Sequence, residues 1–269
     1  MLTNKIRRLK TMKKILILST FLIFSPVTGN IYASDDNLGG GISSNAPFAI
    51  NANVCKLNEG KTMEDYHSLN DKFYKWTKKH DVELTVVSHV PFYSHGNFDN
   101  PDNFDFIEFL IGPNVGKTWD KWLSKKDAED LRNEWASVAT CYVKAASGNF
   151  LYANEDALNK RDLRYAEWNW CNIREGKKAE DLIIEHNRIA KNIEKDPNGM
   201  IGWLTFVPHL GGANVPTFAH IVLYPDVDSV MKNKMAERNG GWKDRRDYET
   251  EFAQCSGSSL MQEEILYRP

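Results

Sequence analysis

Two stretches of the chain repeat one pattern, CKLNEGKTMED at residues 55–65 and CNIREGKKAED at residues 171–181. Six of the eleven aligned positions are identical, at an offset of 116 residues. Further matches follow in the same order: Val90–Pro91 with Val207–Pro208, Pro113 and Val115 with Pro225 and Val227, and Cys141 with Cys255. Offsets that change by only a few residues are typical of two copies of one unit with different loop lengths. The sequence therefore predicts an internal duplication.

Each copy is predicted to contain four strands and two helices in the order β-α-β-β-α-β. In the first copy, alternating and helical apolar spacing predicts strands over 48–57, 83–92, 104–112 and 141–152, and helices over 62–80 and 118–140. In the second copy, strands are expected over 165–173, 200–209, 218–224 and 255–266, and helices over 179–194 and 229–253. Gly240 and Gly241 are expected to break or kink the last helix.

The β-α-β-β-α-β order is that of the ferredoxin-like unit, an antiparallel sheet with helices on one face. A second copy would cover the other face, and Trp168 and Trp170 alternate with Cys171 and Ile173 as if both faces were buried. The chain thus resembles the dimeric α+β barrel superfamily, with both halves in one chain. The resemblance implies an α+β fold of two tandem ferredoxin-like units, 47–158 and 159–269, whose antiparallel sheets pack face to face as a pseudo-twofold barrel.

Four cysteines allow three disulfide pairings. The repeat selects Cys55 with Cys141 and Cys171 with Cys255, because the first and last strands of a ferredoxin-like unit are antiparallel neighbours. The alternative is a set of metal-binding or redox thiols. The absence of a Cys-x-x-Cys pair and the predicted export favour structural bridges.

Residues 1–33 have the pattern of a secretory signal peptide. They hold no acidic residue, six basic residues, and an apolar run from Ile15 to Phe24, and they end at Ala33. Met12 is an alternative start. A membrane anchor is the alternative reading, but the apolar run is shorter than the roughly 20 residues that span a bilayer. We expect a secreted or periplasmic protein, with a flexible linker over 34–46.

Length and composition indicate an ordinary globular protein. The 269 residues are 42% apolar and 26% charged, which excludes wholesale disorder and a disulfide-dense mini-protein. Removal of the first 33 residues leaves 28 basic against 36 acidic side chains, a net charge near −8. We therefore expect no nucleic-acid partner and no membrane association after signal removal. Internal duplication also predicts a monomer with pseudo-symmetry.

Two glycine-rich stretches imitate phosphate-binding loops without completing the motif. Gly60-Lys61-Thr62 has Cys55 where the motif needs its first glycine, and residues 112–118 are one residue short between their glycines. Both are better explained as turns between a strand and a helix. Gly60 would supply an unusual backbone angle, and Thr62 with Asp65 a helix cap.

Positions at which the copies differ are the candidates for chemistry. Aligning Pro113 with Pro225 places Glu108 opposite His220 in the third strands, and both stand among apolar residues. If the strand hairpins line one pocket, four side chains could converge there as catalytic residues: His89, His209, His220 and Glu108. Such a cluster suits acid–base work, a divalent metal or an axial haem ligand, although the sequence requires no cofactor. The alternative for each residue is a satisfied polar group near a strand end.

Further candidates surround these positions. Four aromatic side chains are expected to line the pocket: Tyr93, Trp203, Phe106 and Phe218. The acidic loop after the second strand offers oxygen ligands for calcium at Asp99, Asp102 and Asp105. A solvated turn is the alternative for this loop. Trp119, Trp122 and Trp135 are expected to pack against the sheet.

The sequence does not name a reaction. The resemblance implies a range of roles: cofactor-independent oxygenases, isomerases, haem-handling enzymes and non-catalytic binders. The leading hypothesis is an exported protein that binds or modifies a small apolar or aromatic molecule in a pocket of the barrel. The alternative is a non-catalytic secreted interaction or structural protein stabilised by two disulfides.

Overall fold

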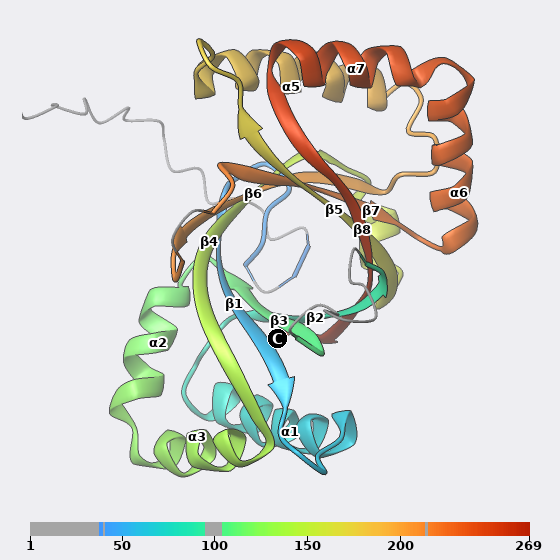
Figure 1. Cartoon of the computed structure of the whole chain (residues 1–269). Helices are drawn as coiled ribbons and strands as arrows, with labels where there is room; N and C mark the ends of the chain where they lie inside the picture. Colours follow the sequence, from blue (N-terminus) through green and yellow to red (C-terminus); the bar gives the residue numbers. More distant parts are fainter. Residues whose placement is uncertain (1–37, 40, 95–103, 213–214) are drawn as a thin grey trace, which may run out of the picture. The chain divides into compact units, whose positions relative to one another are not determined.

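Eight antiparallel strands form one closed barrel, in the order β1-β3-β2-β8-β5-β7-β6-β4 (Figure 1). The structure, a computed structural model, describes residues 38–39, 41–94, 104–212 and 215–269. The strands are β1 (Phe48–Leu57), β2 (Thr85–Tyr93), β3 (Phe106–Gly112), β4 (Ala139–Ala153), β5 (Leu163–Ile173), β6 (Gly202–Leu210), β7 (Phe218–Tyr224) and β8 (Ala253–Tyr267). Each predicted strand is present, with ends that differ by a few residues.

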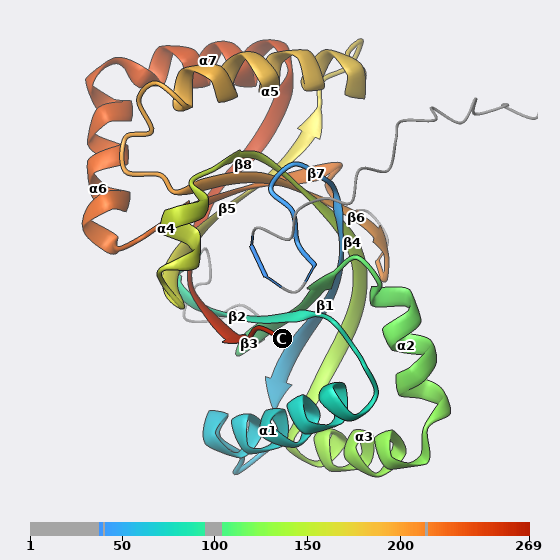
Figure 2. The ribbon, with the colours of Figure 1, turned by 180° about the vertical axis from the view of Figure 1, so that it is seen from behind.

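The main helices lie outside the barrel in two groups (Figures 1 and 2). One group is α1 (Met63–Lys79), α2 (Val115–Ser124) and α3 (Lys126–Val138). The other is α5 (Ala179–Ile193), α6 (Val227–Ala236) and α7 (Trp242–Glu251), with a kink at η1 (Glu237–Gly241) between the last two. The short helix α4 (Glu155–Asn159) connects β4 to β5. Within the described ranges, no helix is long and apolar enough to cross a membrane.

Local sequence explains where these helices begin and break. The Thr62 side chain accepts from the backbone N–H of Asp65, whose carboxylate accepts in return from the N–H of Thr62, so the predicted cap is confirmed. The predicted break at Gly240 is also confirmed, since its φ of +143° lies outside the helical region. The single helix predicted over 118–140 is wrong, because Lys125 is extended and separates α2 from α3.

The barrel closes through two seams between its halves. The first half of the chain forms a four-stranded sheet from β1–β4, and the second half forms another from β5–β8. The two sheets join edge to edge, because β2 pairs with β8 and β4 pairs with β6. The predicted face-to-face packing therefore describes only part of the arrangement. Edge pairing satisfies the backbone groups that an open sheet would leave exposed.

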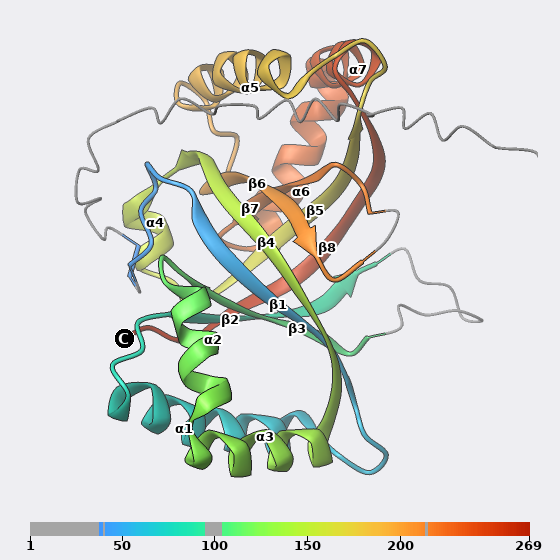
Figure 3. The same ribbon diagram turned by 90° about the vertical axis from the view of Figure 1, so that its left-hand side faces the viewer.

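Strand alternation sends side chains either into the barrel or toward the helices. Phe48, Ile50 and Ala52 of β1 belong to the cluster inside the barrel, while Cys55 belongs to a separate cluster under α1–α3. Figure 3 shows the two helix layers on opposite sides of the strands. The predicted alternation of β5 is confirmed: Trp168 and Trp170 lie in the barrel cluster, and Cys171 and Ile173 lie under α5 and α7.

Part of the expected 34–46 linker packs on the barrel. Leu38 and Ile42 are buried and belong to the cluster inside the barrel. The Leu38 N–H donates to the carbonyl of Ile42, and the Ile42 N–H donates to the carbonyl of Gly39. This turn covers one end of the barrel interior.

Each half is closed by one disulfide. Cys55 lies directly opposite Cys141 in the β1–β4 register, and Cys171 lies opposite Cys255 in the β5–β8 register. Both pairs form disulfides, with the pairing that the repeat selects. Each bridge therefore joins the first and last strands of its own half.

Replacing Cys55 and Cys141 together by alanine should lower the free energy of unfolding by about 4 kcal/mol, because the bridge closes a long loop and so restricts the unfolded chain. Cys171 and Cys255 are the matched pair, since their sequence separation is 84 residues against 86. Urea unfolding without reductant measures both. Losses below about 1 kcal/mol for either double variant would contradict the structural role.

Candidate functional site

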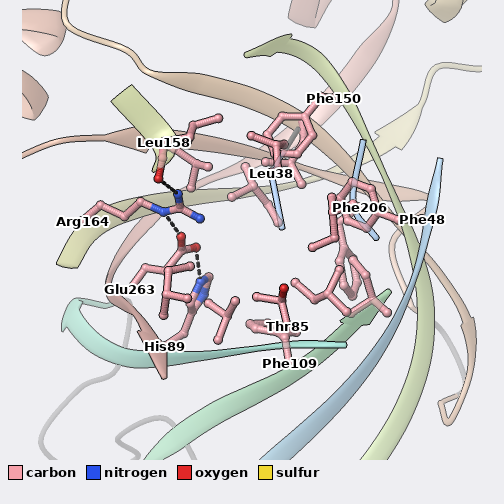
Figure 4. A pocket seen from close by; sticks show the side chains of 18 of the residues that line it. Leu38, Phe48, Thr85, His89, Phe109, Phe150, Leu158, Arg164, Phe206 and Glu263 are labelled. Carbon is pink, nitrogen blue, oxygen red and sulfur yellow. Dashed lines mark hydrogen bonds and ion pairs between the residues drawn. The ribbon is translucent and has the colours of Figure 1, made fainter. Parts of the chain in front are cut away.

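The barrel encloses a largely apolar cavity with a polar row on one wall (Figure 4). The volume of the cavity, including the space at its opening, is about 690 Å³. Its apolar walls combine aliphatic side chains with five aromatic ones, which come from five strands: Phe48, Phe109, Phe150, Trp168 and Phe206. Leu38 and Ile42 line one end together with Leu158 of α4. The cavity thus lies where the inward faces of both sheets meet.

The polar row consists of Arg164, Glu263 and His89. In the strand register, Arg164 of β5 lies opposite Glu263 of β8, which lies opposite His89 of β2. All three side chains are buried. Arg164 Nε donates to Glu263 Oε1, and His89 Nε2 lies 2.5 Å from Glu263 Oε2. Cross-strand register therefore creates a charged row inside an apolar barrel.

Trp168 determines which ring nitrogen of neutral His89 carries the proton. Its indole N–H donates to His89 Nδ1 over 3.1 Å, and because an indole can only donate, Nδ1 must carry a lone pair. A neutral His89 then has its proton on Nε2 and donates it to Glu263. Both ring nitrogens are used within the protein, which leaves neither for a substrate or a haem iron in this arrangement.

Charge pairing keeps Glu263 ionised. Burial opposes its ionisation, but Arg164 and the hydrogen bond from His89 outweigh burial and lower the pKa of Glu263 to about 2. The carboxylate is therefore charged across the ordinary pH range, and Arg164 has a buried counter-charge.

A second guanidinium reaches the same end of the cavity. Arg164 Nη1 and Arg268 Nη2 both donate to the carbonyl of Leu158, each over 3.4 Å. Arg268 Nη1 also pairs with the exposed Asp162, at 2.7 Å. Arg268 Nε is buried and has no hydrogen-bond partner among the described residues. The cavity end is thus rich in donors and positive charge.

The predicted convergence of four catalytic residues is wrong. His89 faces the barrel interior, whereas Glu108 and His220 face outward into the two separate helix layers. His209 is exposed near the end of β6, and its Nε2 lies 2.9 Å from Ser147 Oγ. The physical reason is that successive side chains along a strand point to opposite faces of the sheet.

His220 belongs to a hydrogen-bonded chain under α5 and α7. Trp203 Nε1 donates to His220 Nδ1 over 3.1 Å, and Tyr248 Oη lies 3.0 Å from His220 Nε2 and 2.8 Å from His186 Nε2. Burial lowers the pKa of His220 to about 3 and that of His186 to about 4. Both imidazoles are therefore neutral near pH 7.

The other predicted ligand-binding residues lie in different places. Phe218 packs 5.0 Å from His220 between ring centroids, and Phe106 packs 4.5 Å from Tyr66 under α1. Tyr93 is 54% exposed at the end of β2. None of them lines the barrel cavity described above. Their expected role as one lining is therefore wrong, since they face outward from the strands or lie exposed.

The expected calcium site is only partly described. Asp99 and Asp102 lie outside the described residues, whereas Asp105 is exposed and its Oδ2 accepts from the Leu57 N–H over 2.7 Å. In the described part of the chain, no three His, Cys, Asp or Glu side chains are grouped as metal ligands.

Arg164, Glu263 and Arg268 were missed by the sequence reasoning. A signal was present, because Glu263 stands between Met261 and Ile265 at alternate positions of a strand and so shares their buried face. Its partners Arg164 and His89 are 99 and 174 residues away in the sequence.

Comparisons with known proteins concern the fold. No protein-family model matches the chain, and no curated protein matches its sequence. A proposed monooxygenase from Fusobacterium nucleatum aligns over 83% of this chain and 94% of its own, with a TM-score of 0.51 and 10% identity. A proposed monooxygenase from Lactobacillus acidophilus aligns over 83% and 98%, with a TM-score of 0.51 and 11% identity.

Identities this low show a shared fold alone. The chain therefore shares its overall fold with these two proteins.

Replacing Glu263 by glutamine should lower the free energy of unfolding by about 3–5 kcal/mol, because Arg164 would keep a buried charge without its counter-charge. Glu134→Gln is the matched control. Its carboxylate pairs with Lys72 on the surface, where such pairs contribute about 0–1 kcal/mol. Urea unfolding at pH 7 measures both variants. Equal losses in the two would show that the buried row adds nothing beyond a surface pair.

Glu108 should make the protein less stable as pH rises. Burial raises its pKa to about 7, against the hydrogen bond that Asn53 donates. Since the folded state holds this proton more tightly, its contribution is complete below about pH 4.5 and is lost as pH rises through 7, by about 3 kcal/mol in total.

Glu108→Gln should remove this pH dependence. The test compares the unfolding free energies of wild type and E108Q at pH 4.5 and pH 8. The contributions of all other titrating groups cancel in the difference between the two proteins. Parallel pH profiles would contradict the assignment.

Proposed function

We propose that the chain binds a small organic acid with an apolar body inside the barrel. The observation that carries the proposal is the end of the cavity, where the guanidinium groups of Arg164 and Arg268 meet at the carbonyl of Leu158. The aliphatic and aromatic side chains of the walls suit the apolar body of the ligand, and guanidinium groups suit a carboxylate.

The charges near this end favour an anion. This end holds two guanidinium groups but only one buried carboxylate among the described residues, Glu263, which pairs with Arg164. The partner of Arg268, Asp162, is 69% exposed. Arg268 Nε adds a buried donor that lacks a partner among the described residues. A ligand carboxylate would accept from this donor and offset the remaining positive charge.

The same geometry favours binding over acid–base catalysis at His89. The two ring nitrogens of His89 are bonded to Trp168 and Glu263, so the residue holds the row in place and has no free nitrogen to move a proton of the ligand. The likeness to two proposed monooxygenases supports the fold only.

The proposal includes the setting of the barrel. The two halves, 47–158 and 159–269, would be tandem ferredoxin-like units related by a pseudo-twofold axis, as the shared element order supports. Residues 1–33 would direct export, which the two disulfides support. The barrel would then act on a ligand outside the cytosol, as a monomer.

Benzoate tests the binding site, with benzyl alcohol as its uncharged counterpart. Wild type should bind benzoate at least tenfold more tightly than benzyl alcohol, because only benzoate pairs with the guanidinium groups. Arg268→Gln should remove most of this preference. Titration calorimetry at pH 7 measures both probes.

Asp162→Asn is the matched control. It removes the outer partner of Arg268 and leaves the cavity residues unchanged, so benzoate should bind at least as tightly as to wild type. No saturable benzoate binding to wild type, or an unchanged preference in R268Q, would exclude the proposed site.

A further inference from the structure

A second cavity lies outside the barrel, between β1, β3 and the helices α1–α3. The volume of this cavity, including the space at its opening, is about 920 Å³. Aromatic side chains from all three helices form much of its lining: Tyr66, Phe73, Trp119, Trp122 and Trp135. Glu108 of β3 lies on the sheet side and is 4% exposed. The cavity therefore combines aromatic walls with one buried carboxyl group.

Hydrogen-bond donors are directed toward this carboxyl group. Trp119 Nε1 donates to Asn51 Oδ1 over 3.0 Å, and Asn51 Nδ2 donates to Asn53 Oδ1 over 2.9 Å. Asn53 Nδ2 then donates to Glu108 Oε1 over 3.3 Å. Among the described residues, no Lys, Arg or His forms an ion pair with Glu108. A buried carboxylate without a cation is unfavourable, so the site lacks one positive partner.

A cation that lines this cavity is bound elsewhere. Arg132 also lines the cavity, but its Nη1 donates to the carbonyl of Trp122, and its guanidinium lies 5.7 Å from the centre of the Trp122 ring. Its charge is thus engaged at α2.

The corresponding layer of the second half is different. There, the Trp203–His220–Tyr248–His186 chain joins neutral groups to one another. In the first half, Asn70 is 2% exposed, and both atoms of its side-chain amide have no hydrogen-bond partner in the described part of the chain. Trp135 Nε1 and Tyr74 Oη are also buried without a hydrogen-bond partner among the described residues. In the first-half layer, unused hydrogen-bonding capacity thus accompanies a carboxyl group that has no cationic partner among the described residues.

We propose that this cavity binds a small organic amine with an aromatic or apolar body. Its ammonium group pairs with Glu108, and the tryptophan rings surround its body. A cation next to aromatic faces gains electrostatic energy, and more so in a site shielded from water. This site is separate from the acid-binding cavity in the barrel and prefers the opposite charge.

Benzylamine tests the proposal at pH 8, where it is a cation, and benzyl alcohol is again the uncharged counterpart. Titration calorimetry on the full chain should show benzylammonium binding at least tenfold more tightly than benzyl alcohol. Glu108→Gln should remove this preference, so that both probes bind alike. Benzoate binding in the barrel should be the same in E108Q as in wild type.

Glu167→Gln is the matched control. Glu167 is a buried carboxylate of the second half that already pairs with Lys234 and accepts from Tyr224, so its loss should leave the benzylammonium preference unchanged. No saturable benzylammonium binding to wild type, or a preference retained in E108Q, would overturn the proposal.

A second measurement uses wild type alone. Pairing with the ammonium ionises the Glu108 carboxyl, whose pKa burial otherwise raises to about 7. Binding of benzylammonium at pH 6 should therefore release close to one proton, counted by calorimetry in two buffers of different ionisation enthalpy. Binding without proton release would overturn the proposal even if E108Q does not fold.

Discussion

Closure of the barrel is the constraint on which the other features depend. Because β2 pairs with β8 and β4 with β6, no strand of the barrel keeps a free edge, and every strand side chain points either into the interior or outward. The described chain thereby gains separate compartments, among them the barrel interior, the layer under α1–α3 and the layer under α5–α7.

Each compartment accommodates buried polar groups in its own way. Inside the barrel, three neighbouring strands place Arg164, Glu263 and His89 in one row, where opposite charges offset desolvation. Under α5 and α7, neutral imidazoles and rings bond to one another. Under α1–α3, Glu108 has one amide donor, Asn53, but no cation from the described residues. Chemical differences between the compartments, rather than the shared scaffold, therefore suggest what each one binds.

Sequence patterns predicted the elements well and the site poorly, for one physical reason. Apolar periodicity and the repeated CKLNEGKTMED pattern depend on local spacing, so they located the strands and paired the cysteines. Which face of a strand meets the helices depends on the whole fold. Glu108 and His89 both stand among apolar residues, yet they face different compartments. The partners Arg164 and Glu263 come from distant segments, so only barrel closure brings them together.

Both disulfides stay within their own half, and this has a consequence for how the chain can be divided. In the described part, residues 154–162 are the only backbone connection between β4 and β5, and no covalent cross-link joins the halves. Cutting this connection would leave two internally cross-linked fragments held together by the β2–β8 and β4–β6 seams. The two halves could thus be produced as separate fragments and reassembled through these strand pairs.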